Sequence, residues 1–226
     1  EWIEPVLEPA TAPPERASAD EVDPLTAQKE DVLGADLLVI GVLGQGASSR
    51  VLEVDQSGRA LALKVALTAD DNERLKAEAR VLESLRHARI VQFFELREYA
   101  GHACILMAKA GEQTLQRFLA REGAVSLDYA SRFGEDLLYA LEELEERQIL
   151  HRDLKPANLG VGAAAKKAHH LTLFDFSLAL DLRSDRVSTA SRAQLSVGTA
   201  VYRDPFLRLR GAWDPAADRW SAAVTL

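Results

Sequence analysis

Short apolar runs separated by glycines and polar turns fill the chain between residues 36 and 108. Runs of this length with such boundaries are typical of β-strands, because glycine-containing steps end a strand and turn the chain. The first three runs predict an antiparallel meander, and two further strands follow it. The five runs are residues 37–43, 51–54, 61–67, 90–96 and 103–108.

Helical spacing replaces this pattern in two places. Between residues 70 and 86, apolar side chains from Leu75 to Leu85 recur every three or four positions, behind an aspartate-rich start that suits the positive end of a helix. A longer stretch shows the same spacing from Ala130 to Leu144. A β-rich first part followed by a helical second part predicts an α+β fold of two lobes.

Two charged residues stand where this pattern calls for apolar ones. Lys64 interrupts the apolar run at 61–67, and Glu78 lies on the buried side of its helix, between Leu75 and Leu82. A buried charge without a partner costs several kcal/mol, so we expect Lys64 and Glu78 to pair. The alternative is that both lie at the edges of their elements and reach solvent.

The first 34 residues differ in composition from the rest. Residues 1–30 contain five of the eight prolines and eight acidic residues against two basic ones. Few large apolar side chains are present to offset the entropy of ordering, so residues 1–34 are predicted to form a linker. A docking or regulatory role for this segment is the alternative.

Composition excludes several classes of protein. The chain has 226 residues with a net charge of −8 and no basic stripe, which argues against direct nucleic-acid binding. No apolar run is long enough to span a membrane. The single cysteine, Cys104, lies in an apolar run and is expected to be a buried thiol in a reducing cytoplasm. Because the chain starts at Glu1 and ends in an apolar stretch, we expect it to be a piece of a larger polypeptide with further domains.

Three motifs carry chemistry. Gly44-Gln45-Gly46-Ala47-Ser48-Ser49-Arg50-Val51 lies between two predicted strands, where glycines let backbone amides approach a phosphate. His151-Arg152-Asp153-Leu154-Lys155-Pro156-Ala157-Asn158 follows the long helix, and Asp175-Phe176-Ser177 follows a strand-like run. With Lys64 and Glu78 in the right order, residues 37–226 resemble a eukaryotic-type (Hanks-type) protein kinase of bacterial style. Lys155 within Asp-Leu-Lys-Pro is similar to the serine/threonine class.

This resemblance implies a bilobal fold. A β-rich N-lobe and hinge would occupy residues 35–110, and an incomplete helical C-lobe residues 111–226. It also implies the expected catalytic residues, which are Asp153, Lys155, Lys64 and Glu78. Lys64, oriented by Glu78, would hold the α- and β-phosphates of ATP, and Asp153 would accept the proton of a Ser/Thr hydroxyl of a protein substrate. Lys155 would neutralise the moving phosphate.

The same resemblance implies the nucleotide and metal sites. Asn158 and Asp175 offer oxygen ligands for Mg²⁺ or Mn²⁺. Leu82, Phe93, Phe176 and His151 would form a stacked internal column that links the lobes, with Asp218 as its base. The nucleotide would lie against Gly44, Gln45, Gly46, Ala47, Ser48, Ser49, Val51, Ala62, Lys64, Met107, Ala108 and Ala110, with Met107 as gatekeeper and the two alanines as hinge.

Four positions depart from the family pattern. Ser49 replaces the third loop glycine, Ser177 the glycine after Asp-Phe, and Gly160 a larger residue beneath adenine. Phe206 replaces the glutamate that ends the activation segment, so its usual ion pair cannot form. These departures keep open a pseudokinase that binds ATP as a scaffold, and a second alternative is a small-molecule phosphotransferase of similar fold.

The activation segment is also expected to regulate the enzyme. We expect autophosphorylation at Ser188, Thr189 or Ser191 to order the segment through a cationic partner, with Arg152 placed to supply it. The alternative is a serine-rich flexible loop without this role. The end of the segment, residues 198–206, is similar to that of the large kinases attached to phage-defence gene systems.

Overall fold

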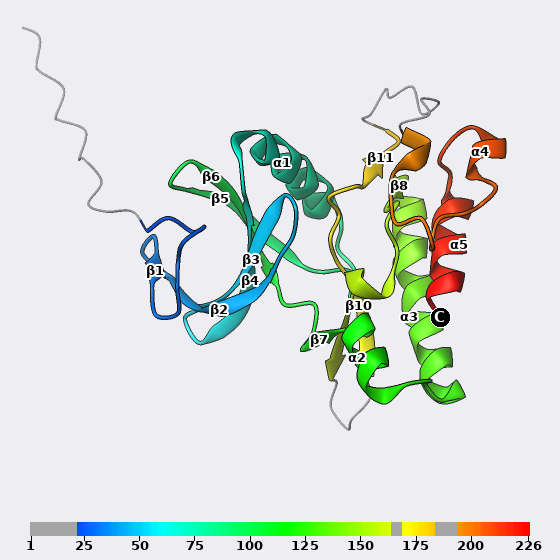
Figure 1. Cartoon of the computed structure of the whole chain (residues 1–226), viewed down its shortest axis with the longest axis horizontal. Coiled ribbons are helices and arrows are strands. Elements are labelled where there is room, and N and C mark those ends of the chain that lie inside the picture. Colours follow the sequence, from blue (N-terminus) through cyan, green and yellow to red (C-terminus); the bar gives the residue numbers. More distant parts are fainter. Residues whose placement is uncertain (1–21, 164–168, 184–193) are drawn as a thin grey trace, which may run out of the picture.

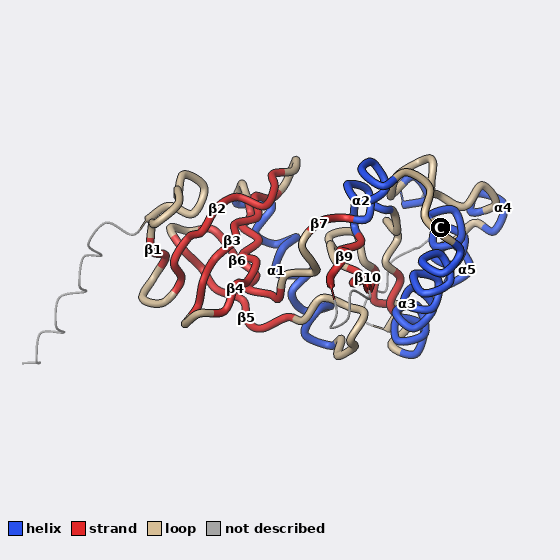
Figure 2. Tube along the Cα trace, turned by 90° about the horizontal axis from the view of Figure 1, so that it is seen from below, coloured by secondary structure: helices blue, strands red, loops and turns tan. Residues whose placement is uncertain are grey.

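The chain folds into a strand-rich lobe and a helix-rich lobe, as Figures 1 and 2 show. This computed structural model describes residues 22–163, 169–183 and 194–226. The strand-rich lobe holds an antiparallel six-stranded sheet in the order β1-β2-β3-β4-β6-β5. The α+β prediction is confirmed, and so is the meander at its centre. The strands are β1 (Val32–Leu33), β2 (Leu37–Gln45), β3 (Ser49–Gln56), β4 (Arg59–Ala66), β5 (Phe93–Tyr99) and β6 (His102–Ala108).

Strand alternation divides the N-lobe core into two layers. On β4, Ala62 and Ala66 face helix α1 (Ala69–Ser84), whereas Leu61, Leu63 and Val65 belong to a separate cluster on the opposite face. The Thr68 side chain caps α1 by accepting a hydrogen bond from the Asp71 N–H. The sheet is therefore covered on both faces, by the helix on one side and by another segment on the other.

That other segment comes from the stretch expected to be a linker. Ala27 and Leu33 are 1% and 0% exposed and pack in the cluster of Leu61 and Leu63. Val22 and Leu25 pack against the same cluster. Residues 22–33 thus form part of the N-lobe core, whereas the sequence pattern assigned the whole of residues 1–34 to a linker.

The second lobe is built around one long helix. α3 (Leu127–Glu146) begins at the Ser126 cap and packs on the hairpin of β9 (Leu159–Ala163) and β10 (His169–Leu173). Helix α5 (Pro215–Thr225) lies beside it (Figure 1). The remaining elements are α2 (Leu115–Glu122), α4 (Leu207–Arg210), β7 (Gln113–Thr114), β8 (Ile149–Leu150), β11 (Leu180–Asp181) and the 3-10 turns Pro156–Asn158 and Gln194–Ser196.

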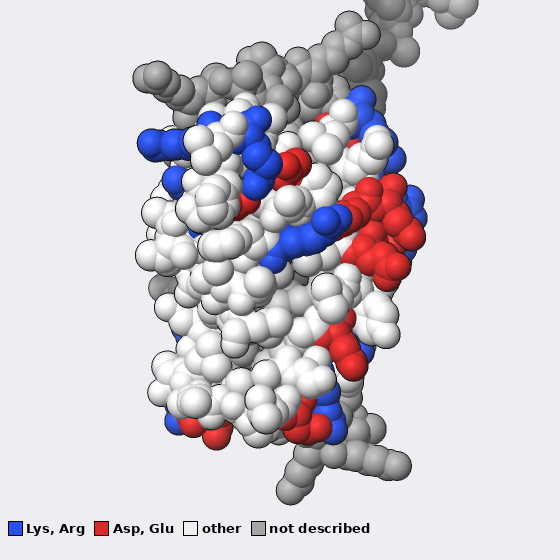
Figure 3. Space-filling model, turned by 90° about the vertical axis from the view of Figure 1, so that its right-hand side faces the viewer, with Lys and Arg blue, Asp and Glu red and all other residues white. Residues whose placement is uncertain are grey.

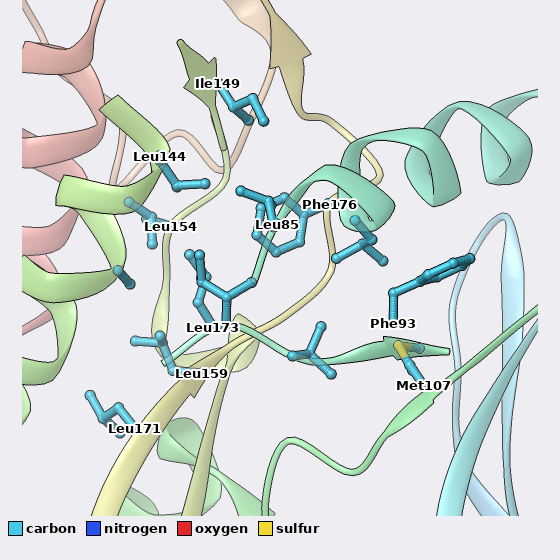
Figure 4. Packing of buried hydrophobic residues seen from close by; sticks show 14 of the residues in the cluster. Leu85, Phe93, Met107, Leu144, Ile149, Leu154, Leu159, Leu171, Leu173 and Phe176 are labelled. Atoms are coloured by element: carbon cyan, nitrogen blue, oxygen red, sulfur yellow. The ribbon is translucent and has the colours of Figure 1, made fainter. Parts of the chain in front are cut away.

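The lobes are joined by a continuous apolar cluster. Figure 4 shows Phe176 beside Leu85 at its centre, with Phe93 and Met107 towards the sheet and Leu154 towards the helices. This cluster fixes the two lobes around the cleft between them.

The outer face of the helical lobe is mostly uncharged. Figure 3 shows uncharged surface over most of this face, one larger acidic group on its right-hand side, and smaller, separate groups of basic side chains. Large apolar side chains are exposed on α4 and α5, and Leu209 is 82% exposed. Among the described residues, no helix is long and apolar enough to cross a membrane.

Candidate active site

A cavity of about 440 Å³ lies between the two lobes. Most of the predicted nucleotide-binding residues line it, which brings together segments up to 131 positions apart, from Gly44 to Asp175. Two predicted nucleotide-binding residues, Ala47 and Ser48, do not line it, since they lie at the tip of the β2–β3 turn. The other predicted site residues that do not line it are Glu78, Asp153, Lys155 and Asn158. The predicted residues that do line it are Gly44, Gln45, Gly46, Ser49, Val51, Ala62, Lys64, Met107, Ala108, Ala110 and Asp175.

The glycine-rich loop is the turn of the β2–β3 hairpin. The Gly46 N–H donates to the Ser49 carbonyl at 2.8 Å, and the Leu67 N–H donates to the Ser48 carbonyl at 3.2 Å. Ser49 lines the cavity in place of the expected third glycine. The loop therefore lines the cavity even though Ser49 stands where the family pattern has a glycine.

Lys64 and Glu78 meet in the core, as their positions in the sequence predict. The Lys64 ammonium donates to both carboxylate oxygens of Glu78 at 2.7 Å and to Asp175 Oδ1 at 2.8 Å. Burial alone would lower the pKa of Lys64, but the two carboxylates outweigh it and raise that pKa. For Asp175 the effect of burial has the opposite sign and would raise the pKa, yet the charge and hydrogen bond of Lys64 hold that pKa at about 2. Both Lys64 and Asp175 are therefore charged at neutral pH.

Asp153 lies at the centre of a second network. Its Oδ2 accepts hydrogen bonds from Lys155 Nζ at 2.6 Å and from Asn158 Nδ2 at 3.1 Å. Asn158 Nδ2 also donates to the Asp153 carbonyl at 2.9 Å. The Asn158 amide nitrogen is thus committed to Asp153, which leaves its oxygen as the available ligand.

Thr199 completes this network, and the sequence analysis missed it. Its N–H and hydroxyl donate to Asp153 Oδ1 at 2.9 and 2.7 Å, and its hydroxyl accepts from Lys155 Nζ at 2.9 Å. The preceding residue, Gly198, has φ +84° and packs against the Arg152 carbonyl. The Gly-Thr pair after the serine-rich segment was the available signal.

The loop that carries Asp153 is held from α5. The buried Asp218 carboxylate accepts the backbone N–H groups of His151 at 2.6 Å and Arg152 at 2.9 Å. Burial raises the pKa of Asp218, although His151 and the two N–H groups oppose this. The hydrogen bonds to Asp218 permit the φ of +67° at Arg152, which lies next to the Asp153 backbone.

The hinge approaches β9 unusually closely. The Ala108 N–H donates to the Gln92 carbonyl at 2.9 Å, and Ala108 and Ala110 both line the cavity. A Cβ at Gly160 would lie 2.5 Å from the carbonyl carbon of Ala110, and one at Gly111 would lie 2.5 Å from the Val161 backbone. Gly160 therefore replaces a larger residue because the hinge backbone occupies the space of its side chain.

Comparison with known proteins agrees with this geometry. Residues 37–226 match the family model described as the protein kinase domain. The chain is 32% identical to "Probable kinase PglW" of Streptomyces coelicolor over 93% of its length, and 29% identical to the serine/threonine-protein kinase pkn2 of Myxococcus xanthus over 85%. It is 30% identical, over 81% of its length, to the calcium/calmodulin-dependent protein kinase type II alpha chain of Drosophila melanogaster.

The chain spans 15%, 24% and 35% of these three relatives. The match covers both lobes, including the cavity, the Lys64–Glu78 pair and the Asp153 network. The chain belongs to the protein kinase family.

Proposed function

We propose that this chain transfers the γ-phosphate of ATP to serine or threonine hydroxyls of proteins. The observation that carries the proposal is the Asp153 network, in which the carboxylate already accepts an alcohol, the Thr199 hydroxyl, at 2.7 Å. A substrate hydroxyl at this carboxylate would be oriented in the same way, and Asp153 would accept its proton. The relative named as serine/threonine-protein kinase pkn2 of Myxococcus xanthus supports the same chemistry.

Two lysines would contact different phosphates of ATP. Lys64, fixed by Glu78, would hold the α- and β-phosphates within the cavity. Lys155 is 2.6 Å from Asp153, and its ammonium would neutralise the phosphate as it moves to the substrate hydroxyl. Positioning and charge neutralisation of this kind supply most of the catalysis in phosphoryl transfer.

The residues present fit a hard divalent cation. Asp175 is ionised, with a pKa of about 2, and the Asn158 oxygen is left for a ligand by the hydrogen bonds of its nitrogen. Two protein oxygens suit Mg²⁺ or Mn²⁺, which complete their shells with phosphate oxygens and water. The bound cation would neutralise charge on the β- and γ-phosphates.

Autophosphorylation of the activation segment belongs to the same proposal. The expected acceptors Ser188, Thr189 and Ser191 lie outside the described residues. Phosphosite mapping of active protein tests this part: phosphate at one of the three residues supports it, and an unmodified segment in active protein contradicts it.

Phosphate transfer from labelled ATP tests the main proposal. The full chain is compared with Asp153→Ala and Asp175→Ala, and with Asp128→Ala as a matched control on the exposed face of α3. We expect phosphoserine or phosphothreonine in the wild type and the control, and loss of at least about 100-fold in the other two.

Two outcomes would contradict the proposal. ATP binding without transfer to any protein, in the wild type, would indicate a pseudokinase scaffold. Transfer to a small molecule alone would indicate a phosphotransferase of a different substrate class.

A further inference from the structure

Arg50 lies in the β3 strand that follows the glycine-rich loop, on the side away from the cavity. Its neighbours Ser49 and Val51 both line the cavity. Side chains alternate along a strand, so Arg50 points to the opposite face, as does Leu52, which is fully buried there. Arg50 is therefore not a ligand of the nucleotide, although it adjoins the loop that covers it.

The guanidinium of Arg50 binds the segment that precedes the sheet. It donates to the Pro24 carbonyl at 3.3 Å, to the Leu25 carbonyl and, at 2.9 Å, to the Ala27 carbonyl. The forked shape of the guanidinium is what lets one side chain bind three carbonyls. A single residue thus joins the strand next to the loop to a segment 23 to 26 positions upstream.

The same segment is held independently by packing. Ala27 and Leu33 are buried in one cluster with Leu52, and the Asp23 side chain accepts the Leu25 N–H at 2.8 Å. This segment lies before residue 37, where the match to the kinase family begins. In Figure 1 it lies beside β1 and β2, at the end of the N-lobe remote from the helical lobe.

We propose that Arg50 is a positioning residue that couples the order of residues 22–28 to the glycine-rich loop, and thereby sets the affinity for ATP. The effect on affinity rests on the ATP binding proposed above. When only a fraction of molecules holds the loop in its binding position, the apparent dissociation constant rises by the inverse of that fraction. Arg50 increases the fraction because its hydrogen bonds anchor one side of the β2–β3 hairpin.

Two variants break the same contact from opposite sides. Arg50→Ala removes the donor, and a truncation of residues 1–28 removes the three acceptors while leaving Arg50 in place. The controls are a truncation of residues 1–21, which keeps all three carbonyls, and Arg59→Ala, which removes an arginine from the neighbouring strand whose guanidinium lies over Phe94 instead. Arg50→Lys keeps the charge but not the fork.

We expect Arg50→Ala to raise the dissociation constant and KM for ATP by at least about threefold, with little change in kcat at saturating ATP. The 1–28 truncation, which also removes Ala27 from the core cluster, should raise both values by at least the same factor. Adding Arg50→Ala to the 1–28 truncation should raise neither the dissociation constant nor KM further, because the truncated chain no longer holds the carbonyls that Arg50 binds. Arg50→Lys should fall between wild type and Arg50→Ala. Unchanged ATP affinity in both variants would overturn the proposal, and so would independent factors that multiply in the double variant.

Amide hydrogen exchange tests the coupling between the two segments without relying on ATP binding. Residues 44–49 should exchange faster in the 1–28 truncation, and residues 22–28 faster in Arg50→Ala, whether or not nucleotide is bound. If the wild type binds no ATP but both segments respond, the coupling stands and the proposed function fails. If residues 44–49 keep wild-type exchange in the truncation, the coupling itself is wrong.

Discussion

Gly160 gives opposite predictions from the family pattern and from the structure. The pattern places a larger residue here, so Gly160→Leu should complete the floor of the adenine site and strengthen ATP binding. In the structure, a Cβ at this position would lie 2.5 Å from the Ala110 carbonyl carbon and 2.7 Å from the Ala110 Cβ. Restoring an ordinary contact of 3.4 Å requires the hinge to move by about 1 Å.

A shift of that size acts on both stability and binding. Overpacking of this kind costs about 1–3 kcal/mol of unfolding free energy. The hinge backbone also moves away from adenine, and loss of about one hydrogen bond weakens ATP binding by roughly tenfold. The β7–β9 pairing, in which Thr114 is opposite Gly160, is strained by the same movement.

Gly162→Ala is the matched control, because Gly162 lies in the same strand as Gly160. A Cβ at Gly162 would meet only the Gly111 Cα, at an ordinary contact distance of 3.9 Å. Denaturant unfolding and titration with a fluorescent ATP analogue, on Gly160→Ala, Gly160→Leu and the control, measure both effects. Wild-type stability together with equal or tighter ATP binding in Gly160→Leu would refute the reasoning, because the hinge would then not be held against β9.

Three further predictions concern other parts of the chain. Asp218→Asn should lower the unfolding free energy by about 2–3 kcal/mol, measured by denaturant unfolding, because the buried carboxylate accepts two backbone N–H groups. Thr199→Val should lower kcat for protein substrate roughly tenfold without changing ATP affinity, whereas Thr199→Ser should retain activity. Cys104 is fully buried, and burial raises its pKa to about 12, so an aromatic disulfide reagent at pH 8 should label it only as fast as the chain unfolds.

The pairing of Lys64 with Glu78 could be predicted because both residues break an apolar pattern. A charge inside a strand and another on the buried side of a helix have few ways to be satisfied, so each indicates the other. The Asp153 and Asp175 motifs could be placed because their residues and their order along the chain resemble those of the protein kinase family. The Gly-Thr pair marks Thr199 in the sequence but does not show its partner, because the contact with Asp153 spans 46 positions and depends on how Gly198 packs.

The role of residues 22–33 could not be read from composition. Proline and acidic residues indicate a linker only when no apolar side chain finds a partner. Here a few apolar side chains, Ala27 and Leu33 among them, are buried in the core on this face of the sheet, and Arg50 provides hydrogen bonds that no local pattern contains. Tertiary contacts override a compositional signal in this way because a core is closed by whichever segment can reach it.

The substitution at Phe206 shows why a motif position has to be judged together with its partner. Phe206 lacks the carboxylate of the usual ion pair, and its ring lies edge-on to Trp220 at 6.2 Å. Asp204, two residues earlier, supplies a carboxylate in the same region. It is buried, accepts a hydrogen bond from the Phe206 N–H at 2.8 Å and forms an ion pair with Arg210. Arg210 also pairs with Asp214, the cap of α5, at 2.9 Å. The end of the activation segment is therefore tied to the C-lobe by charge despite the missing glutamate, because anchoring requires a paired carboxylate in this region and does not require it at residue 206.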